Sequence, residues 1–446
     1  MANISIGNLC DSQESAWLNL NEGSIEPPLL GTAYDYKIQP GGTVTESLHI
    51  ALRGSTSSIR NTIKLLEDYL VKINRHSREG VGQPHYLRLY DQDDGLYRYS
   101  HILSAHLEGL PNTLIYKETG SLAIDLIVTR ENYWDSDEIA LPLSNSTGTD
   151  VTSGLTIFNH AAETHENYCT IDTSGLGSDF PPPMRLEFTN LYSSNFLGDL
   201  WMGAFGLDSE GEFPNLQFEI TTGTAGSLVT DSSASNGSYF NATWTSAGWQ
   251  TLTALLIPSS TLQDCDGRWF LPILRIHTAP SIANLQLRLA ITAGGSTIFE
   301  SPAKTISTTQ CFALFTPIQL PMGDLPKLHA STPYTVNLQA LCPTSGSYAL
   351  QLDWLGFLPQ DLFTCYQSIT GAAQSDVITD DGFSGRVATS RSYAELITHR
   401  RVGSPPILAG KHSARLYLFM VSSANRAETA RTISLKAWYR KRRQVL

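Results

Sequence analysis

The chain has 446 residues, 41% of them hydrophobic, and a formal net charge of −12 at pH 7. That apolar share supports ordinary folded cores and excludes a largely disordered chain. At about 100–200 residues per domain, the length predicts two or three domains. The longest apolar runs, such as residues 252–258, have the length of strands and are too short to span a membrane. The N-terminal residues lack the basic and apolar regions of a secretory signal.

Charge is distributed unevenly along the chain. Residues 1–140 carry 11 Lys and Arg against 19 Asp and Glu (net −8), residues 141–370 carry 6 against 18 (net −12), and residues 371–446 carry 13 against 5 (net +8). The acidic body argues against a general nucleic-acid binder, because affinity for phosphates needs an extended basic surface. A basic end on an acidic body suits head-to-tail self-association, and a solvated basic terminus is the open alternative.

The first 140 residues predict an α+β domain. Residues 1–42 are rich in turn formers and indicate an extended arm with short strand pieces. A half-buried strand is expected at 44–52, followed by a long helix and then by strands at 85–90, 97–110 and 122–128. The helix is predicted from apolar residues at steps of three and four, which would brace the sheet: Ile59, Ile63, Leu66, Leu70 and Ile73.

From residue 141 the pattern becomes one of short β-rich runs, separated by Gly, Asn or Pro and without a convincing helix. The runs between 184 and 359 recur at intervals of roughly ten to fifteen residues, which predicts an antiparallel β-sandwich of jelly-roll type over 141–370. Further strands are expected at 385–389, 393–398, 416–421 and 432–439. The segment 371–446 would either complete the first domain or form a small sheet of its own.

Motifs for catalysis, nucleotides or metals are missing from the sequence. It contains no nucleophile elbow, P-loop, dinucleotide fingerprint or HExxH. The six scattered cysteines are expected to be reduced and mostly buried, and His160 and His165 to lie in a polar loop rather than at a metal. Asp353 and Asp361 are better explained as structural residues than as a catalytic pair. We therefore expect no enzyme activity and no cofactor.

Tryptophans in the central region leave one binding role open. Some of these side chains could form a platform on which sugars stack, although Trp is usually buried and core packing is the simpler interpretation. The residues concerned are Trp201, Trp244, Trp249, Trp269 and Trp354.

Three segments carry a resemblance to a known family. SLAIDLIVTRENYWDS, continuing into RENYWDSDEIALPLSN (130–145), resembles the strand that closes the N-terminal domain of tail structural proteins of long-tailed, siphophage-type bacteriophages. The strand–helix–strand order from Thr43 to Thr129 is similar to the tail-tube and distal-tail building block. LQLDWLGFLPQD (350–361) and ISLKAWYRKRRQVL (433–446) look like features of large prophage virion proteins that carry a carbohydrate-binding-like jelly roll.

The resemblance implies a non-enzymatic virion protein, made in the host cytoplasm, that assembles into trimeric or hexameric rings in the phage tail. Its partners would be its own copies, other tail proteins, and DNA that passes through a lumen without specific binding. The basic residues Arg440, Lys441, Arg442 and Arg443 are the expected subunit interface. Two alternatives are a carbohydrate-binding or receptor-adsorption protein of the virion, and a β-sandwich glycan hydrolase.

Overall fold

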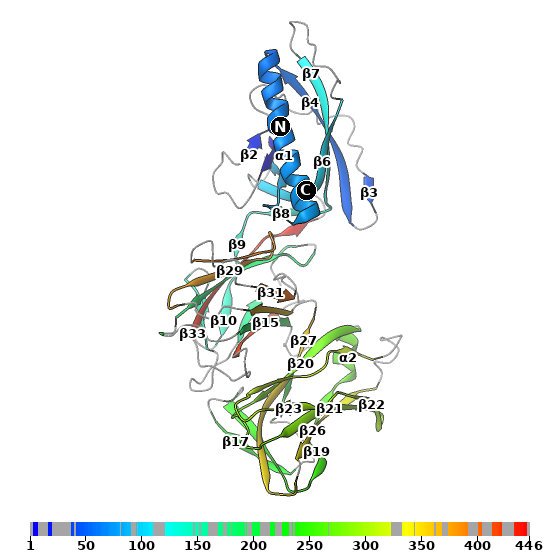
Figure 1. Ribbon diagram of the computed structural model, residues 1–446, viewed down its shortest axis with the longest axis vertical. Coiled ribbons are helices and arrows are strands. Elements are labelled where there is room, and N and C mark those ends of the chain that lie inside the picture. Colours follow the sequence, from blue (N-terminus) through cyan, green and yellow to red (C-terminus); the bar gives the residue numbers. More distant parts are fainter. Residues whose placement is uncertain are drawn as a thin grey trace. The chain divides into compact units, whose positions relative to one another are not determined.

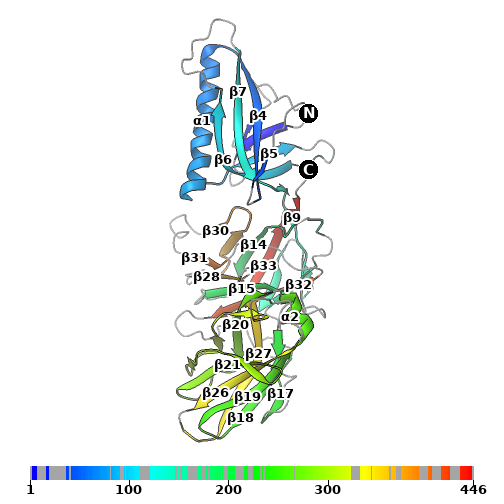
Figure 2. The same cartoon turned by 90° about the vertical axis from the view of Figure 1, so that its right-hand side faces the viewer.

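The fold is mainly β, as the computed structural model of the chain shows (Figures 1 and 2). The residues that the structure describes are 3–7, 17–19, 37–39, 42–80, 82–90, 95, 97–109, 121–145, 148–150, 153–158, 168–172, 176–178, 180–191, 193, 199–205, 215–218, 225–231, 234, 237–265, 267–322, 332–342, 344–360, 363–367, 373–390, 400–403, 413–421 and 432–443.

The chain forms two compact units. Unit 1 contains Met1–Glu138, Gly177–Phe180 and Arg440–Leu446, and unit 2 contains Ile139–Leu176 and Pro181–Tyr439. These limits differ from the expected ones at 140/141 and 370/371. Most of the C-terminal segment belongs to unit 2, because its strands pair with strands from the first part of that unit. The last residues alone belong to unit 1.

Unit 1 is built on a nine-stranded sheet and one long helix. The strand order is β2-β1-β5-β6-β7-β4-β3, with β8 paired to β6 and β34 paired to β8. The strands are β1 (Asn3–Gly7), β2 (Trp17–Asn19), β3 (Lys37–Gln39), β4 (Thr43–Arg53), β5 (Tyr86–Tyr90), β6 (Tyr97–Glu108), β7 (Ser121–Glu131), β8 (Trp134–Ser136) and β34 (Arg442–Arg443). The α+β unit expected from the sequence is present, with a helix of 24 residues.

Helix α1 (Thr56–Glu79) has both of its ends capped and one apolar side. The Ser55 side chain accepts a hydrogen bond from the Ser58 N–H, and Gly80 ends the helix in the left-handed conformation at φ 64°. Figure 2 shows α1 running along one face of the sheet. The side chains that it buries in the core of unit 1 are the five named from the helical period: Ile59, Ile63, Leu66, Leu70 and Ile73.

Unit 2 contains two β-sandwiches, each with its own core. In the first, the sheets have the orders β12-β33-β14-β29-β30 and β11-β10-β13-β32-β15-β28-β31, with β9 paired to β33. Its strands are β9 (Ile139–Ala140), β10 (Leu143–Asn145), β11 (Gly148–Asp150), β12 (Leu155–Phe158), β13 (Tyr168–Asp172), β14 (Met184–Asn190), β15 (Asp199–Phe205), β28 (Phe363–Gln367), β29 (Val377–Asp381), β30 (Arg386–Thr389), β31 (Arg400–Gly403), β32 (Ser413–Val421) and β33 (Thr432–Tyr439).

The second sandwich lies, in the sequence, between β15 and β28 of the first. Its sheets have the orders β17-β18-β27-β20-β24 and β19-β26-β21-β22. Its elements are β16 (Asn215–Gln217), β17 (Gly226–Thr230), β18 (Ser238–Trp244), β19 (Gly248–Ile257), α2 (Ser259–Cys265), β20 (Arg268–Ile276), β21 (Leu285–Ala293), β22 (Ser296–Glu300), β23 (Lys304–Ile306), β24 (Phe312–Leu314), β25 (Ile318–Leu320), β26 (Tyr334–Cys342) and β27 (Tyr348–Pro359).

Both sandwiches have the strand order of a jelly roll. Eight strands of each sandwich follow this order, with β12-β33-β14-β29 in one sheet of the first and β13-β32-β15-β28 in the other, and with β18-β27-β20-β24 and β19-β26-β21-β22 in the two sheets of the second. Among these eight, the first strand lies beside the last: β12 beside β33, and β18 beside β27. The second strand likewise lies beside the last but one, as β13 does beside β32 and β19 beside β26. The sequence therefore predicted the β-sandwich class correctly but indicated one sandwich where the structure has two. The periodic runs were recognised, but periodicity does not specify which strands pair.

The structure contains one helix that the sequence did not predict, and some expected features lie outside the described residues. The short helix α2 was not expected; it buries Thr261, Leu262 and Cys265, too few residues to give a helical period. The strand expected at 393–398 lies outside the described residues, as do both His160 and His165.

Candidate assembly surface

Strand β4 leaves one side of its backbone open at the margin of the unit 1 sheet. It pairs with β7 along its whole length, from Thr43 to Arg53. On its other side, β3 pairs with residues 43–45. Among the described residues, no strand lies beside 46–53 on that side. This segment, the β4 edge, carries backbone groups that an added strand could bind.

The antiparallel ladder identifies which backbone groups the β4 edge presents. The Asn132 N–H donates to the Gly42 carbonyl at 3.0 Å, which makes 42 and 132 a hydrogen-bonded pair next to the β4–β7 ladder. Such pairs recur at every second residue. The even-numbered residues of β4 therefore bond to β7, and the N–H and C=O groups of the odd-numbered residues 47–53 point to the open side.

The opposite margin of the β4–β7–β6 ladder is covered by the helix. β5 pairs with β6 at residues 97–101, so the outer side of the second half of β6 has no strand partner among the described residues. There the Asn74 side chain of α1 donates to the Ala105 carbonyl at 2.8 Å and accepts from the Ala105 N–H at 3.2 Å. One side-chain amide thus stands in for a neighbouring strand. Among the described residues, the sheet therefore has one margin capped by a side chain and one margin without a partner along 46–53.

The face of the ladder that points away from α1 is polar. Three rows of side chains cross β6, β7 and β4 on this face: Ser104–Thr129–Thr45, His106–Ile127–Ser47 and Glu108–Asp125–His49. Within the rows the Thr45 and Thr129 hydroxyls lie 3.1 Å apart, and His49 Nδ1 lies 2.5 Å from an Asp125 carboxylate oxygen. None of these nine residues is Lys or Arg. We call this surface the open face.

A buried ion pair fixes β4 against β7 on the helix side. Glu46 and Arg130 are 7% and 6% exposed, and the Arg130 guanidinium lies 2.5 Å from a Glu46 carboxylate oxygen. Arg130 also donates to the Glu131 carbonyl and the Ser100 hydroxyl, and it stacks on the Trp134 ring. A shift of β4 by one residue against β7 would place the Glu46 carboxylate on the opposite face from Arg130, so the pair selects this register.

The basic C-terminal residues lie within unit 1, where the side chains of Arg440 and Arg442 have partners in their own chain. Arg442 makes two hydrogen bonds of 2.9 Å to Asp135, whose side chain is 3% exposed. Arg440 donates to the Ser136 carbonyl and pairs with Glu138 at 3.4 Å. Arg443 is exposed and Lys441 partly exposed. Arg440 and Arg442 therefore attach the end of the chain to β8, a role that the sequence analysis did not assign to them.

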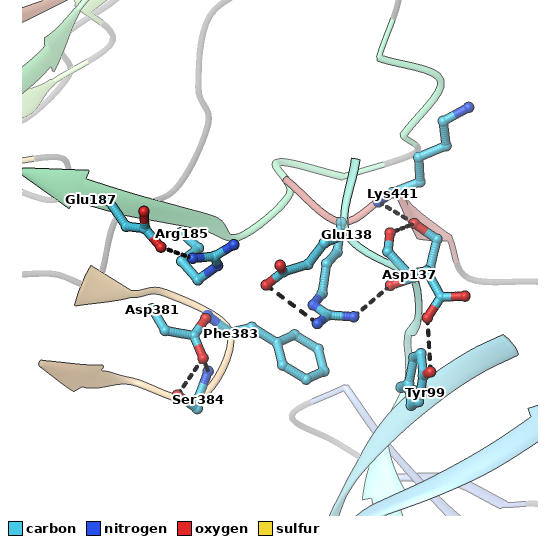
Figure 3. Close-up of polar contacts among 11 residues, drawn as sticks. Tyr99, Asp137, Glu138, Arg185, Glu187, Asp381, Phe383, Ser384 and Lys441 are labelled. Atoms are coloured by element: carbon cyan, nitrogen blue, oxygen red, sulfur yellow. Dashed lines mark hydrogen bonds and ion pairs between the residues drawn. The ribbon is translucent and has the colours of Figure 1, made fainter. Parts of the chain in front are cut away.

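Figure 3 shows the polar contacts of this region of unit 1, including the hydrogen bond of 2.8 Å from the Tyr99 hydroxyl to Asp137. Burial and this contact raise the pKa of Tyr99 well above its ordinary value. In unit 2 the same figure shows the turn between β29 and β30, in which Asp381 accepts hydrogen bonds from the Phe383 and Ser384 N–H groups. All of these contacts are structural, and none assembles a reactive centre.

The tryptophans separate into buried and accessible residues. Trp244 and Trp354 are 8% and 1% exposed, and both belong to the core of the second jelly roll. Trp269 is 52% exposed, and Trp249 is partly exposed. The Trp201 side chain lies outside what the structure describes. A shared platform of all five is therefore excluded, because two of them face the core.

Most of the described residues that were considered for catalysis or metal binding are buried in the folded units. Asp353 is fully buried and paired with Arg275. Cys169, Cys265, Cys342 and Cys365 are buried free thiols and Cys311 is partly buried, as expected, while Cys10 is not described. Within the described ranges, no group of three or more His, Cys, Asp or Glu side chains could hold a metal ion. Neither described helix has the length and apolarity needed to span a bilayer.

The helical period of the sequence predicted the buried side of α1, whereas Asn74, Glu46 and Arg130 were not expected to have a role. Asn74 follows directly after the apolar residue Ile73, and its polar character gave no sign that it reaches a strand. Glu46 stands at an inward position of an alternating strand, between Val44 and Leu48, and a charge at such a position was a usable signal for a buried partner.

Comparisons with known proteins give faint similarities. No protein-family model and no curated protein matches the chain. Among solved structures, a chain of the phage P2 baseplate in its activated conformation with Ca is 10% identical, with 79% of this chain and 97% of that chain covered and a TM-score of 0.19. A candidate secreted protein of Parabacteroides distasonis is 10% identical, with 55% of this chain and 98% of that chain covered and a TM-score of 0.18. A chain from the structure of infectious bursal disease virus Gt strain is 8% identical, with 83% of this chain and 87% of that chain covered and a TM-score of 0.19. TM-scores this low do not show a shared fold.

Proposed function

We propose that the protein is a non-enzymatic structural subunit of a phage virion, of tail-tube or distal-tail type. The observation that carries this proposal is the contrast between the two margins of the unit 1 ladder. Asn74 caps the margin at Ala105, whereas the odd-numbered residues 47–53 of the β4 edge present their backbone groups without a strand partner among the described residues. Proteins normally cover such an edge, so an edge left open suits pairing with another chain.

In the proposed assembly, strands of neighbouring copies pair at the β4 edge until a ring of three or six subunits closes. Closure removes the open edges altogether. The open face would then line a channel through which DNA passes. Its Ser and Thr hydroxyls, together with Asp125 and Glu108, offer no concentration of positive charge that would hold phosphates. Other tail proteins would bind the two ends of the ring.

The role of the basic C-terminus as a subunit interface is part of this proposal. Because Arg440 and Arg442 are engaged with Glu138 and Asp135, contacts to an acidic neighbouring copy would fall chiefly to Lys441 and Arg443. Reversing the charge of these two side chains should weaken ring formation at low salt and leave the unfolding of unit 1 unchanged. Ring formation that keeps its strength and its salt dependence would leave these residues as a solvated end.

The experiment that tests the proposal removes one backbone N–H from the β4 edge. His49 is an odd-numbered residue with an exposed side chain, so His49→Pro deletes an outward N–H without breaking the bonds between β4 and β7. The matched control His49→Thr removes the same imidazole and keeps the N–H. Light scattering after size exclusion, with electron microscopy, should show rings for the native chain and for His49→Thr, and smaller species for His49→Pro. A native chain that stays monomeric at high concentration, or equal rings in both variants, would contradict the proposal.

The second candidate is a carbohydrate-binding or receptor-adsorption protein of the virion. It is favoured by one surface of the second jelly roll, across β19, β26, β21 and β22. Arg288 lies 4.3 Å from the Trp249 ring and donates to Gln339 at 2.8 Å, and it pairs with Glu300 at 3.0 Å. Gln339 in turn donates to Thr251. An aromatic ring beside amide, hydroxyl and charged groups has the donors and acceptors that a sugar would use.

A glycan array distinguishes this candidate from the first. Binding that is lost in Trp249→Ala and kept in Trp269→Ala would support the candidate, because Trp269 is exposed on the other sheet of the same sandwich. An array without binding by the native chain would remove it and would leave the assembly proposal unaffected.

A further inference from the structure

Three histidines lie in the region where the last turns of α1 pack on the sheet of unit 1. The rings of His76, on α1, and His101, on β6, have centroids 6.2 Å apart. His85, just before β5, has its ring edge-on to Tyr69 of α1 at 5.9 Å. Its backbone carbonyl accepts from the Ile102 N–H, next to His101. The three residues come from three different elements, and together they occupy the contact between the helix end and the sheet.

The charged neighbours of this cluster are unevenly balanced. Lys72, one turn before His76 on α1, contributes a permanent positive charge that acts on His85. The compensating group is Glu131 of β7, whose carboxylate lies 3.6 Å from His101 Nδ1. The positive charge of Arg442, which is hydrogen-bonded to Asp135, also acts on the Glu131 carboxylate. The Tyr86 ring of β5 lies 5.5 Å from the His101 ring in a tilted arrangement, and it adds no charge at neutral pH.

The fold opposes the protonation of His85. It is 6% exposed, and its Nδ1 lies 2.9 Å from the Gln83 carbonyl, which fixes the ring. Burial lowers the pKa of His85, and the charges of Lys72, His76 and His101 lower it further, against the hydrogen bond to Gln83. His76, by contrast, lies in the last turn of α1, where the helix dipole favours a positive charge.

We propose that His76, His85 and His101 form an acid-sensitive latch that holds the last turns of α1 on β6. Above the ordinary pKa of imidazole the buried His85 ring packs as a neutral group. As the pH falls through about 6.5, the unfolded or opened segment takes up the proton that His85 resists in the closed state. Protonation therefore favours opening, and the closed state loses stability as the pH falls.

Opening of this latch would uncover the capped margin of the sheet. Asn74, whose side chain binds both backbone groups of Ala105, lies two residues before His76 on the same helix. Release of the last turns of α1 would take the Asn74 amide away from Ala105. Mild acid would thus convert the capped margin of β6 into a second open margin. This inference does not depend on the proposed function, because it concerns the closed and open states of a single chain.

Hydrogen exchange of the full chain tests the latch. The Ala105 amide is the reporter, since its N–H is held by Asn74. After correction for the intrinsic effect of pH, protection at 103–109 and at 72–79 should fall about tenfold or more between pH 7.5 and pH 5.5. Peptides from β21 and β26 of the second jelly roll should keep their protection. Unchanged protection at 103–109 in the native chain would overturn the proposal.

Substitution identifies the responsible groups. His85→Gln keeps a side-chain donor for the Gln83 carbonyl but cannot take up a proton, so it should abolish most of the loss of protection. The control His106→Gln removes an exposed imidazole near the end of β6 and should behave like the native chain. A loss that is undiminished in His85→Gln would overturn the proposal. If that variant does not fold, NMR titration of the histidine rings in the native chain is used instead. Protonation of His85 without any change in the NMR signals of α1 would also overturn the proposal.

Discussion

The Asn74 side chain satisfies both backbone polar groups of Ala105, with hydrogen bonds of 2.8 and 3.2 Å. A residue of a helix thereby completes a strand at the point where β5 has ended and β6 continues. The contact links two features that would otherwise be independent, the position of α1 along the sheet and the state of one sheet margin. It also explains why α1 carries an amide next to its apolar side.

Replacing Asn74 by Ala should destabilise unit 1 by about 1–3 kcal/mol, because the Ala105 N–H and C=O would lose their partner. Denaturant unfolding followed by a probe in unit 1 measures this free energy. Arg75→Ala is the matched control on the next residue. Its exposed pair with Glu79 should contribute less than about 0.5 kcal/mol. Equal losses of unfolding free energy in the two variants would show that the Asn74 hydrogen bonds do not stabilise unit 1.

Breaking the buried pair of Glu46 and Arg130 should be costly when a single partner is removed. Arg130→Met would leave the Glu46 carboxylate, on a residue that is 7% exposed, without its partner, and this should lower the unfolding free energy by about 3–5 kcal/mol. The double variant, with Glu46→Met added, should recover much of that loss, because apolar residues of similar volume need no desolvation. A double-mutant cycle of unfolding free energies provides the measurement, and strictly additive losses would disprove the coupling.

Removing Arg442 should destabilise unit 1 in a pH-dependent manner. Burial raises the pKa of Asp135, and the two hydrogen bonds from Arg442 partly oppose this shift. A raised carboxyl pKa means that the folded state holds the proton more tightly, so this group contributes less stability as the pH rises above about 3.8. Without Arg442 the pKa of Asp135 should rise further.

The stability measured for Arg442→Ala should therefore fall below that of the native chain by about 3–5 kcal/mol at pH 7 and by clearly less near pH 4. Thermal unfolding across this pH range gives the comparison, with Arg443→Ala as a control at an exposed neighbour. A deficit that is constant with pH would show that Asp135 is not the group affected.

The buried thiols should be inert in the folded protein. Burial raises the pKa of Cys169 and of Cys265 to about 12, so almost no thiolate exists at neutral pH. Alkylation followed by mass spectrometry should label Cys311, which is partly exposed, well before either of them. Addition of denaturant should make all three react. Rapid labelling of Cys169 in the native chain would contradict the burial that the structure assigns to it.

Local patterns determined the elements and their classes. The five apolar residues from Ile59 to Ile73 recur with the period of a helix, and that helix lies where the sequence predicted it. Alternation along 44–52 and 122–128 likewise predicted β4 and β7, and the turn-separated runs predicted a β-sandwich. These features depend on residues within a few positions of one another, so the sequence alone was sufficient to reveal them.

Pairing between distant residues was decided by the tertiary structure. Arg442 and Asp135 are 307 positions apart, and β15 and β28 of one jelly roll are separated by the whole of another. A period in the sequence gives the face of a strand but not its neighbour, so one expected sandwich became two. The same limit applies to the candidate assembly surface. Whether a strand edge is open depends on what lies beside it, and Asn74 and the β4 edge therefore acquired their meaning only when α1 and the sheet were placed together.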